Sequence, residues 1–74
     1  MPHITVQHFP QDLGEERRAA FVAAVTEAVT AAFGVGEGAV SIALEPVPAE
    51  DWEDRVHAPQ IVGRADLLVK SPAY

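Results

Sequence analysis

The chain has no cysteine, only five basic residues and no long hydrophobic run. Without cysteine, disulfide bridges and thiolate metal sites are excluded, and an intracellular location is natural. The basic side chains are outnumbered by eleven acidic ones, and the resulting net charge of −6 repels nucleic-acid phosphates and anionic lipids. We therefore expect neither nucleic acid nor a membrane as a partner.

No apolar stretch approaches the roughly 20 residues of a transmembrane span, and the first residues lack the basic and apolar regions of a signal peptide. We expect a soluble, cytoplasmic protein. Its 74 residues allow one domain, residues 1–74. A chain this short buries only about 60% of its unfolded surface, so its stability alone is marginal. With no disulfide to help, oligomerisation is the expected way to enlarge the core.

The first half of the sequence predicts a strand followed by a long helix. Ile4 and Val6 alternate with polar neighbours between His3 and Phe9, the period-two pattern of a half-buried strand. Asp12 and Glu15 have the spacing of a capping box, so a helix should begin near Leu13. Gly34 is a candidate C-cap. The apolar residues of this helix share one stripe: Phe21, Val22, Val25, Ala28, Val29, Ala32 and Phe33.

A second strand follows, because Val40, Ile42 and Leu44 again alternate with other residues. Strand, helix and strand in this order predict an α+β protomer, a β-α-β unit with two parallel strands and a right-handed crossover. Two strands leave both edges unpaired, so we expect a homodimer, with a hexamer as the larger alternative.

The last third is less regular. It predicts a short helical turn over residues 49–57, around Trp52, and a final short helix from Ile61 to Val69 that ends before Pro72.

Common cofactor and metal signatures are not met. The glycines of Gly34–Gly38 follow a helix instead of opening one, so they predict a helix stop and a turn instead of a phosphate loop. His3 and His8 lie five residues apart on one strand and therefore face opposite sides, so they cannot share an ion. We expect no metal and no cofactor.

The most informative residue is Pro2. Methionine aminopeptidases remove Met1 when a small residue such as proline follows, which would leave Pro2 with a free secondary amine. In an apolar pocket, desolvation would lower the pKa of this amine toward neutrality, so that it could act as a general base. Retention of Met1 would make the same nitrogen a non-basic amide.

The chain resembles the 4-oxalocrotonate tautomerase family over nearly its whole length, most closely the bacterial branch that acts on phenylpyruvate-like enols. The resemblance rests on the following segments: Pro2-His3-Ile4, Phe9-Pro10, Ser41-Ile42-Ala43-Leu44, Trp52, Ala58-Pro59-Gln60 and Lys70-Ser71-Pro72-Ala73-Tyr74. It implies a β-α-β protomer that assembles into dimers or hexamers, needs no cofactor and uses the N-terminal proline as the general base. It also implies that Trp52 is the aromatic wall of the pocket.

The founding members hold a dicarboxylate with two arginines, and this sequence has Gln11, Asp12 and Leu13 in one of those neighbourhoods and Ser41 in the other. Dicarboxylates should therefore bind poorly. We expect a keto-enol tautomerase that acts on a small enol or keto acid through a 1,3-proton shift. The candidate site residues are Pro2 as catalytic base, and Trp52, Phe9, Ser41, Arg55 and Lys70 in substrate binding. Arg64, His8 and backbone amides are further candidates for the substrate carboxylate.

Two other functions stay open from the sequence. One is a non-catalytic oligomeric module on the same fold, in which the acidic segment around Trp52 docks a partner protein. The other is a proline-dependent hydratase, which the sequence cannot distinguish from a tautomerase.

Overall fold

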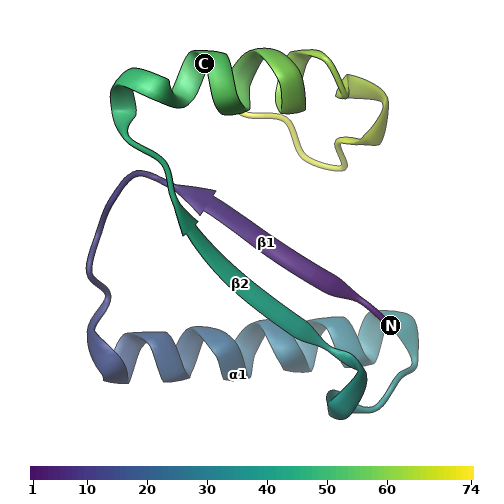
Figure 1. The fold of residues 1–74 in the computed structure, drawn as a ribbon. Coiled ribbons are helices and arrows are strands. Elements are labelled where there is room, and N and C mark those ends of the chain that lie inside the picture. The colour runs from purple at the N-terminus through teal and green to yellow at the C-terminus, as the bar shows by residue number, and fades with distance from the viewer.

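The computed structural model describes all 74 residues, and its centre is a two-stranded parallel sheet. Strand β1, His3–His8, pairs with strand β2, Ser41–Pro46, in a register that runs from His3 opposite Ser41 to His8 opposite Pro46. Helix α1, Gly14–Phe33, connects the two strands, and a short 3-10 helix η1, Glu37–Ala39, precedes β2 (Figure 1). The expected α+β protomer with a β-α-β unit is confirmed.

The two ends of α1 differ in how well the sequence predicted them. At the C-terminus, Gly34 takes a left-handed φ of 65° and its N–H donates to the carbonyl of Thr30, as expected of a C-cap. At the N-terminus, the expected capping box between Asp12 and Glu15 is not formed. Gly14, with φ 77°, turns the chain between these residues, so the Asp12 carboxylate accepts the N–H of Gly14 at 2.9 Å.

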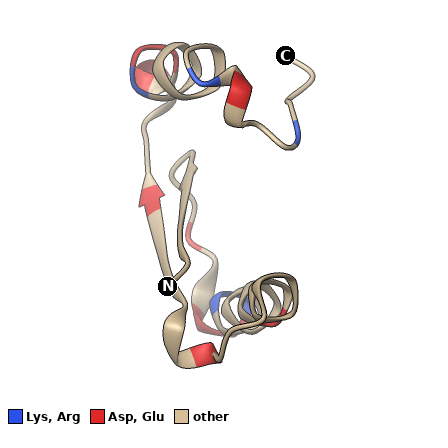
Figure 2. Ribbon diagram, turned by 90° about the vertical axis from the view of Figure 1, so that its right-hand side faces the viewer, with Lys and Arg blue, Asp and Glu red and all other residues tan.

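The two faces of the sheet have opposite character. Ile4, Val6, Ile42 and Leu44 are half-buried on the face toward α1. On the other face, the residues in the first part of each strand are exposed: His3, Thr5, Ser41 and Ala43. Figure 2 shows α1 on one side of the sheet and no element on the other. No helix in the chain combines the length and the apolar character needed to cross a membrane.

The C-terminal segment lies beyond the carboxyl ends of both strands (Figure 1). It consists of a 3-10 helix η2, Ala49–Asp51, a ten-residue π-helix η3, Glu53–Val62, and a 3-10 turn η4, Ala65–Leu67. The helical turn around Trp52 is confirmed. The predicted final helix from Ile61 to Val69 is wrong, because η3 ends at Val62 and the chain is irregular after η4.

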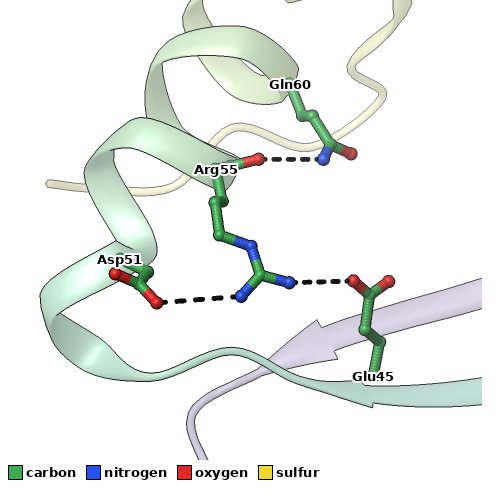
Figure 3. A network of polar contacts seen from close by, with 4 residues as sticks. All are labelled: Glu45, Asp51, Arg55 and Gln60. Atoms are coloured by element: carbon green, nitrogen blue, oxygen red, sulfur yellow. Dashed lines mark hydrogen bonds and ion pairs between the residues drawn. The ribbon is translucent and has the colours of Figure 1, made fainter.

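Pro59 provides a physical reason for the wide turns of η3. Proline has no N–H to donate to the carbonyl four residues earlier, and its ring collides with that carbonyl in an α-helix. Here the carbonyl concerned belongs to Arg55, and it accepts a hydrogen bond from the Gln60 side-chain amide at 3.0 Å instead (Figure 3). A register with i to i+5 bonds accommodates the proline without leaving this carbonyl unpaired.

A single protomer buries little of itself. Val47 and Val56 are the only buried residues, at the junction of the strand ends with the C-terminal segment. The accessible surface is 5579 Å², whereas a monomeric protein of this mass is expected to expose roughly 4,400 Å². The radius of gyration, 13.9 Å, also exceeds the roughly 11 Å expected for 74 residues. One protomer is therefore more extended and more exposed than is usual for a monomer of this size.

Candidate active site

Pro2 lies at the start of β1, beside an apolar hollow. Ile4, Val29 and Phe33 form the apolar wall of this hollow, which has a volume of about 390 Å³ and is also lined by Met1, Pro2 and His3. The backbone holds the site in place, since the N–H of Ser41 donates to the carbonyl of Pro2 at 3.2 Å. Met1 is fully exposed, so the Met1-Pro2 bond is open to solvent.

The sequence did not single out Val29 and Phe33 as neighbours of Pro2. They belong to the last turns of α1, and the parallel crossover requires these turns to lie beside the end of the sheet where β2 begins. Because β1 begins at the same end of the sheet, the C-terminus of α1 must lie beside the start of the chain. The apolar stripe of α1 together with the parallel topology was therefore the signal that could have identified them.

Ser41 lies next to Pro2, on the open face of the sheet. Its hydroxyl forms a hydrogen bond of 2.7 Å with Nδ1 of His3, and the hydroxyl of Thr5 lies 3.2 Å from Nε2 of the same ring. All three side chains are exposed. Of the expected substrate-binding residues, Ser41 is thus the one that shares an end of the sheet with Pro2.

The aromatic residues gather at the other end of the sheet. The rings of Phe9 and Trp52 meet edge to face, with centroids 5.1 Å apart and planes at 85°. The indole Nε1–H of Trp52 donates to the hydroxyl of Tyr74 at 3.1 Å. These three rings, with His8 and Gln11, line an open pocket of about 520 Å³. We call Phe9, Trp52 and Tyr74, with His8 and Gln11, the aromatic pocket.

Pro2 and the aromatic pocket do not meet within one protomer. Pro2 precedes β1 and Phe9 follows it. Seven residues of extended chain at about 3.3 Å each separate them by roughly 23 Å. The neighbours of Pro2 within the protomer are therefore Val29 and Phe33, not Phe9 and Trp52.

The two cations expected to bind substrate differ in their surroundings. Arg55 is engaged by two carboxylates, with Glu45 at 3.4 Å and Asp51 at 3.8 Å (Figure 3). Its guanidinium lies outside both the hollow at Pro2 and the aromatic pocket. Lys70 is exposed in the irregular tail, and its ammonium forms no hydrogen bond or ion pair. Arg55 is thus occupied by the protein itself, whereas Lys70 is available.

Comparisons with known proteins agree with this architecture. The family model described as "Tautomerase enzyme" matches residues 2–54, which include both strands, α1 and Trp52. Tautomerase PptA of Enterobacter sp. (strain 638) is 36% identical over 74 residues, covering 100% of this chain and 97% of that protein. Tautomerase PptA of Pectobacterium carotovorum subsp. carotovorum (strain PC1) is 34% identical, and that of Escherichia coli O139:H28 is 31% identical, both with the same coverage. With its β-α-β unit and this full-length similarity, the chain belongs to the tautomerase family of isomerases.

Proposed function

We propose that this tautomerase interconverts the enol and keto forms of a small 2-oxo acid, with the amine of Pro2 as the general base and without a cofactor. The observation that carries the proposal is the apolar hollow beside Pro2, which Ile4, Val29 and Phe33 line. Once Met1 has been removed and a second copy covers the open side of the hollow, an amine at this position would be poorly hydrated. Desolvation disfavours the ammonium form, so it lowers the pKa of the prolyl amine toward the pH of the cell.

The reaction is a 1,3-proton shift. The Pro2 nitrogen accepts the proton of the enol hydroxyl, which leaves an enolate, and the oxygen electron pair forms the C=O bond as the carbon is protonated. The electron pair of the C=C bond then takes a proton at carbon from the prolyl ammonium, which restores the free amine. Positioned acid-base catalysis of this kind contributes about 10²- to 10⁴-fold. The ammonium formed midway also stabilises the negative charge that develops on the substrate.

The aromatic pocket completes the site if a second copy supplies it. A two-fold axis normal to the sheet makes paired edge strands antiparallel, so the start of β1 in one protomer comes to lie beside the end of a strand in its partner. The 23 Å between Pro2 and Phe9 within one chain is then no obstacle. Trp52 of the partner subunit would form the outer wall around the Pro2 amine, and the rings would accommodate an aryl group of the substrate.

The surface of the protomer supports such an assembly. Each copy exposes about 1,200 Å² more than a monomer of its mass should. Burial of this excess by both copies would give an interface of about 2,400 Å², within the range of obligate dimers. We propose a homodimer, because the C-terminal segment of each copy already covers the surface at the ends of its own strands, which a larger assembly would use for contacts. A trimer of dimers would be the larger form.

The decisive experiment compares two preparations whose N-termini are verified by intact mass. In the first preparation, Met1 is removed. In the second, Met1 or an uncleaved N-terminal extension stays bonded to the Pro2 nitrogen. We expect only the Met1-free protein to accelerate the ketonisation of phenylpyruvate enol, followed by the loss of enol absorbance. Equal rates in the two preparations would show that the Pro2 nitrogen is not the base, and equal rates no faster than in buffer would favour the non-catalytic module.

Mixed dimers test whether the site is shared. Pro2→Ala and Trp52→Ala proteins are unfolded together and refolded in equal amounts. In each heterodimer, one site combines both substitutions and the other has Pro2 from one copy and Trp52 from the other. Random pairing should therefore restore about a quarter of the native sites. If both residues of a site came from one chain, no native site would form and mixing would restore no activity.

A further inference from the structure

The tail of the chain folds back onto Trp52. The hydroxyl of Tyr74, 22 residues later in the sequence, accepts the indole N–H at 3.1 Å. The Tyr74 ring also packs against the imidazole of His57, with centroids 5.5 Å apart and planes tilted by 41°. His57 is in turn fixed by its hydrogen bond of 2.6 Å to the Glu53 carboxylate, one helical turn away.

Burial does not account for the position of Tyr74. The residue is 71% exposed, and the tail from Leu68 onward has no helix or strand to hold it. Its specific contacts are the hydrogen bond to Trp52 and the ring contact with His57. An exposed tyrosine held in this way contributes little to the core, so its effect should fall on the side chain that it contacts.

Trp52 needs such a contact to keep one orientation. Its indole is half-buried, and the edge-to-face contact with Phe9 restrains one side of the ring. Phe9 is itself 53% exposed and cannot lock the indole alone. A hydrogen bond at Nε1 fixes the second side of the indole, because this N–H is the only polar group of the ring.

We propose that Tyr74 is a positioning residue that sets the orientation of the Trp52 indole, and through it the fit of a flat aryl group in the aromatic pocket. The proposal rests on the proposed function, in which this pocket receives the substrate. Glu53 and His57 support Tyr74 from the other side, so a chain of four side chains links η3 and the tail to the pocket wall. Pro2 takes no part in this chain, so the base should be untouched by changes in it.

The test uses Tyr74→Phe, which keeps the ring and removes the acceptor, with Ser71→Ala in the same exposed tail as control. Trp52 is the only tryptophan, so its fluorescence reports this indole alone. Binding of the unreactive aryl acid 3-phenylpropionate is measured by quenching of that fluorescence, and binding of hexanoate is measured by competition. We expect Tyr74→Phe to lower the anisotropy of Trp52 and to weaken the aryl acid about threefold to tenfold, as the loss of one neutral hydrogen bond does. Hexanoate should change less than twofold.

In the tautomerase assay, the same variant should raise KM for phenylpyruvate enol by a similar factor and leave kcat within about twofold, since the base is unchanged. The control should match the wild type in every measurement. If Tyr74→Phe has wild-type anisotropy and wild-type affinity for the aryl acid, the positioning role is refuted. The two proposals can fail separately. If the Met1-free wild type is inactive but still binds the aryl acid more tightly than Tyr74→Phe, the proposed reaction is overturned. The role of Tyr74 in binding is then still supported.

Discussion

Replacement of Gly63 by alanine should destabilise the C-terminal segment. A Cβ at this position would lie 2.8 Å from the carbonyl oxygen of Pro59 and 3.0 Å from that of Ala58. Both are backbone atoms near the end of η3, and the Ala58 carbonyl already accepts the N–H of Gly63 at 2.8 Å. The methyl group therefore cannot be accommodated by a side-chain rotation. The helix end must move, which strains or breaks this hydrogen bond.

The magnitude follows from two opposing effects. Forcing a methyl group into a packed site costs about 1–3 kcal/mol. Alanine recovers about 0.4–1 kcal/mol because it restricts the unfolded chain. The net loss should be about 1–2 kcal/mol, and each kcal/mol lowers Tm by about 4–8 °C in a domain of this size.

Thermal unfolding followed by circular dichroism measures the effect, at one fixed protein concentration because association contributes to stability. Gly36→Ala is the matched control, since Gly36 has an extended backbone with φ −77° and no atom within 4 Å of its Cβ position. This control should be neutral or slightly stabilising. If Gly63→Ala melts at or above the wild-type temperature, the close approach of the backbone at the end of η3 does not constrain the fold.

Three further predictions concern assembly and the site. Light scattering at micromolar concentration should give twice the 7.9 kDa of one chain or a higher multiple, and a folded monomer would contradict the proposed interface. Trp52→Ala should admit water to the site and raise the pKa of the Pro2 amine, so the acidic limb of the pH-rate profile should move to higher pH. An unchanged profile with a lower Tm would show that Trp52 is a packing residue only. Arg55→Gln should change KM by less than about twofold and the free energy of unfolding by less than about 1 kcal/mol, because Arg55 forms half-exposed ion pairs with the protein itself. A large rise in KM would show that Arg55 binds the substrate.

The sequence predicted the β-α-β unit well because its signals are local. Alternation in β1 and β2 and the C-cap at Gly34 act within a few residues, and the structure confirms all three. The C-terminal segment was predicted less well. A helical period of 3.6 residues does not describe a π-helix, and the proline at position 59 that favours the wider register looks, in sequence, like a reason for a helix to stop.

The candidate site shows a different limit. Pro2 was identified as the candidate base by its chemistry and by the family resemblance, since proline is the residue that presents a secondary amine at a chain end. Its apolar neighbours Val29 and Phe33 required the topology, which places the end of α1 beside the start of β1. The contact of Tyr74 with Trp52 spans 22 residues and has no periodic pattern to reveal it. Residue type thus identified the candidate base, and only the three-dimensional arrangement identified what surrounds it.

The placement of Pro2 and the aromatic pocket at opposite ends of β1 has a kinetic consequence. If each site is formed by two chains, a folded protomer that has not met its partner has no site, however well its own secondary structure has formed. After dilution from denaturant, helical signal should return in a first-order phase. Activity should return in a second-order phase, which becomes faster as the chain concentration is raised. At sufficiently low concentration, the enzyme should lose activity as its dimers dissociate.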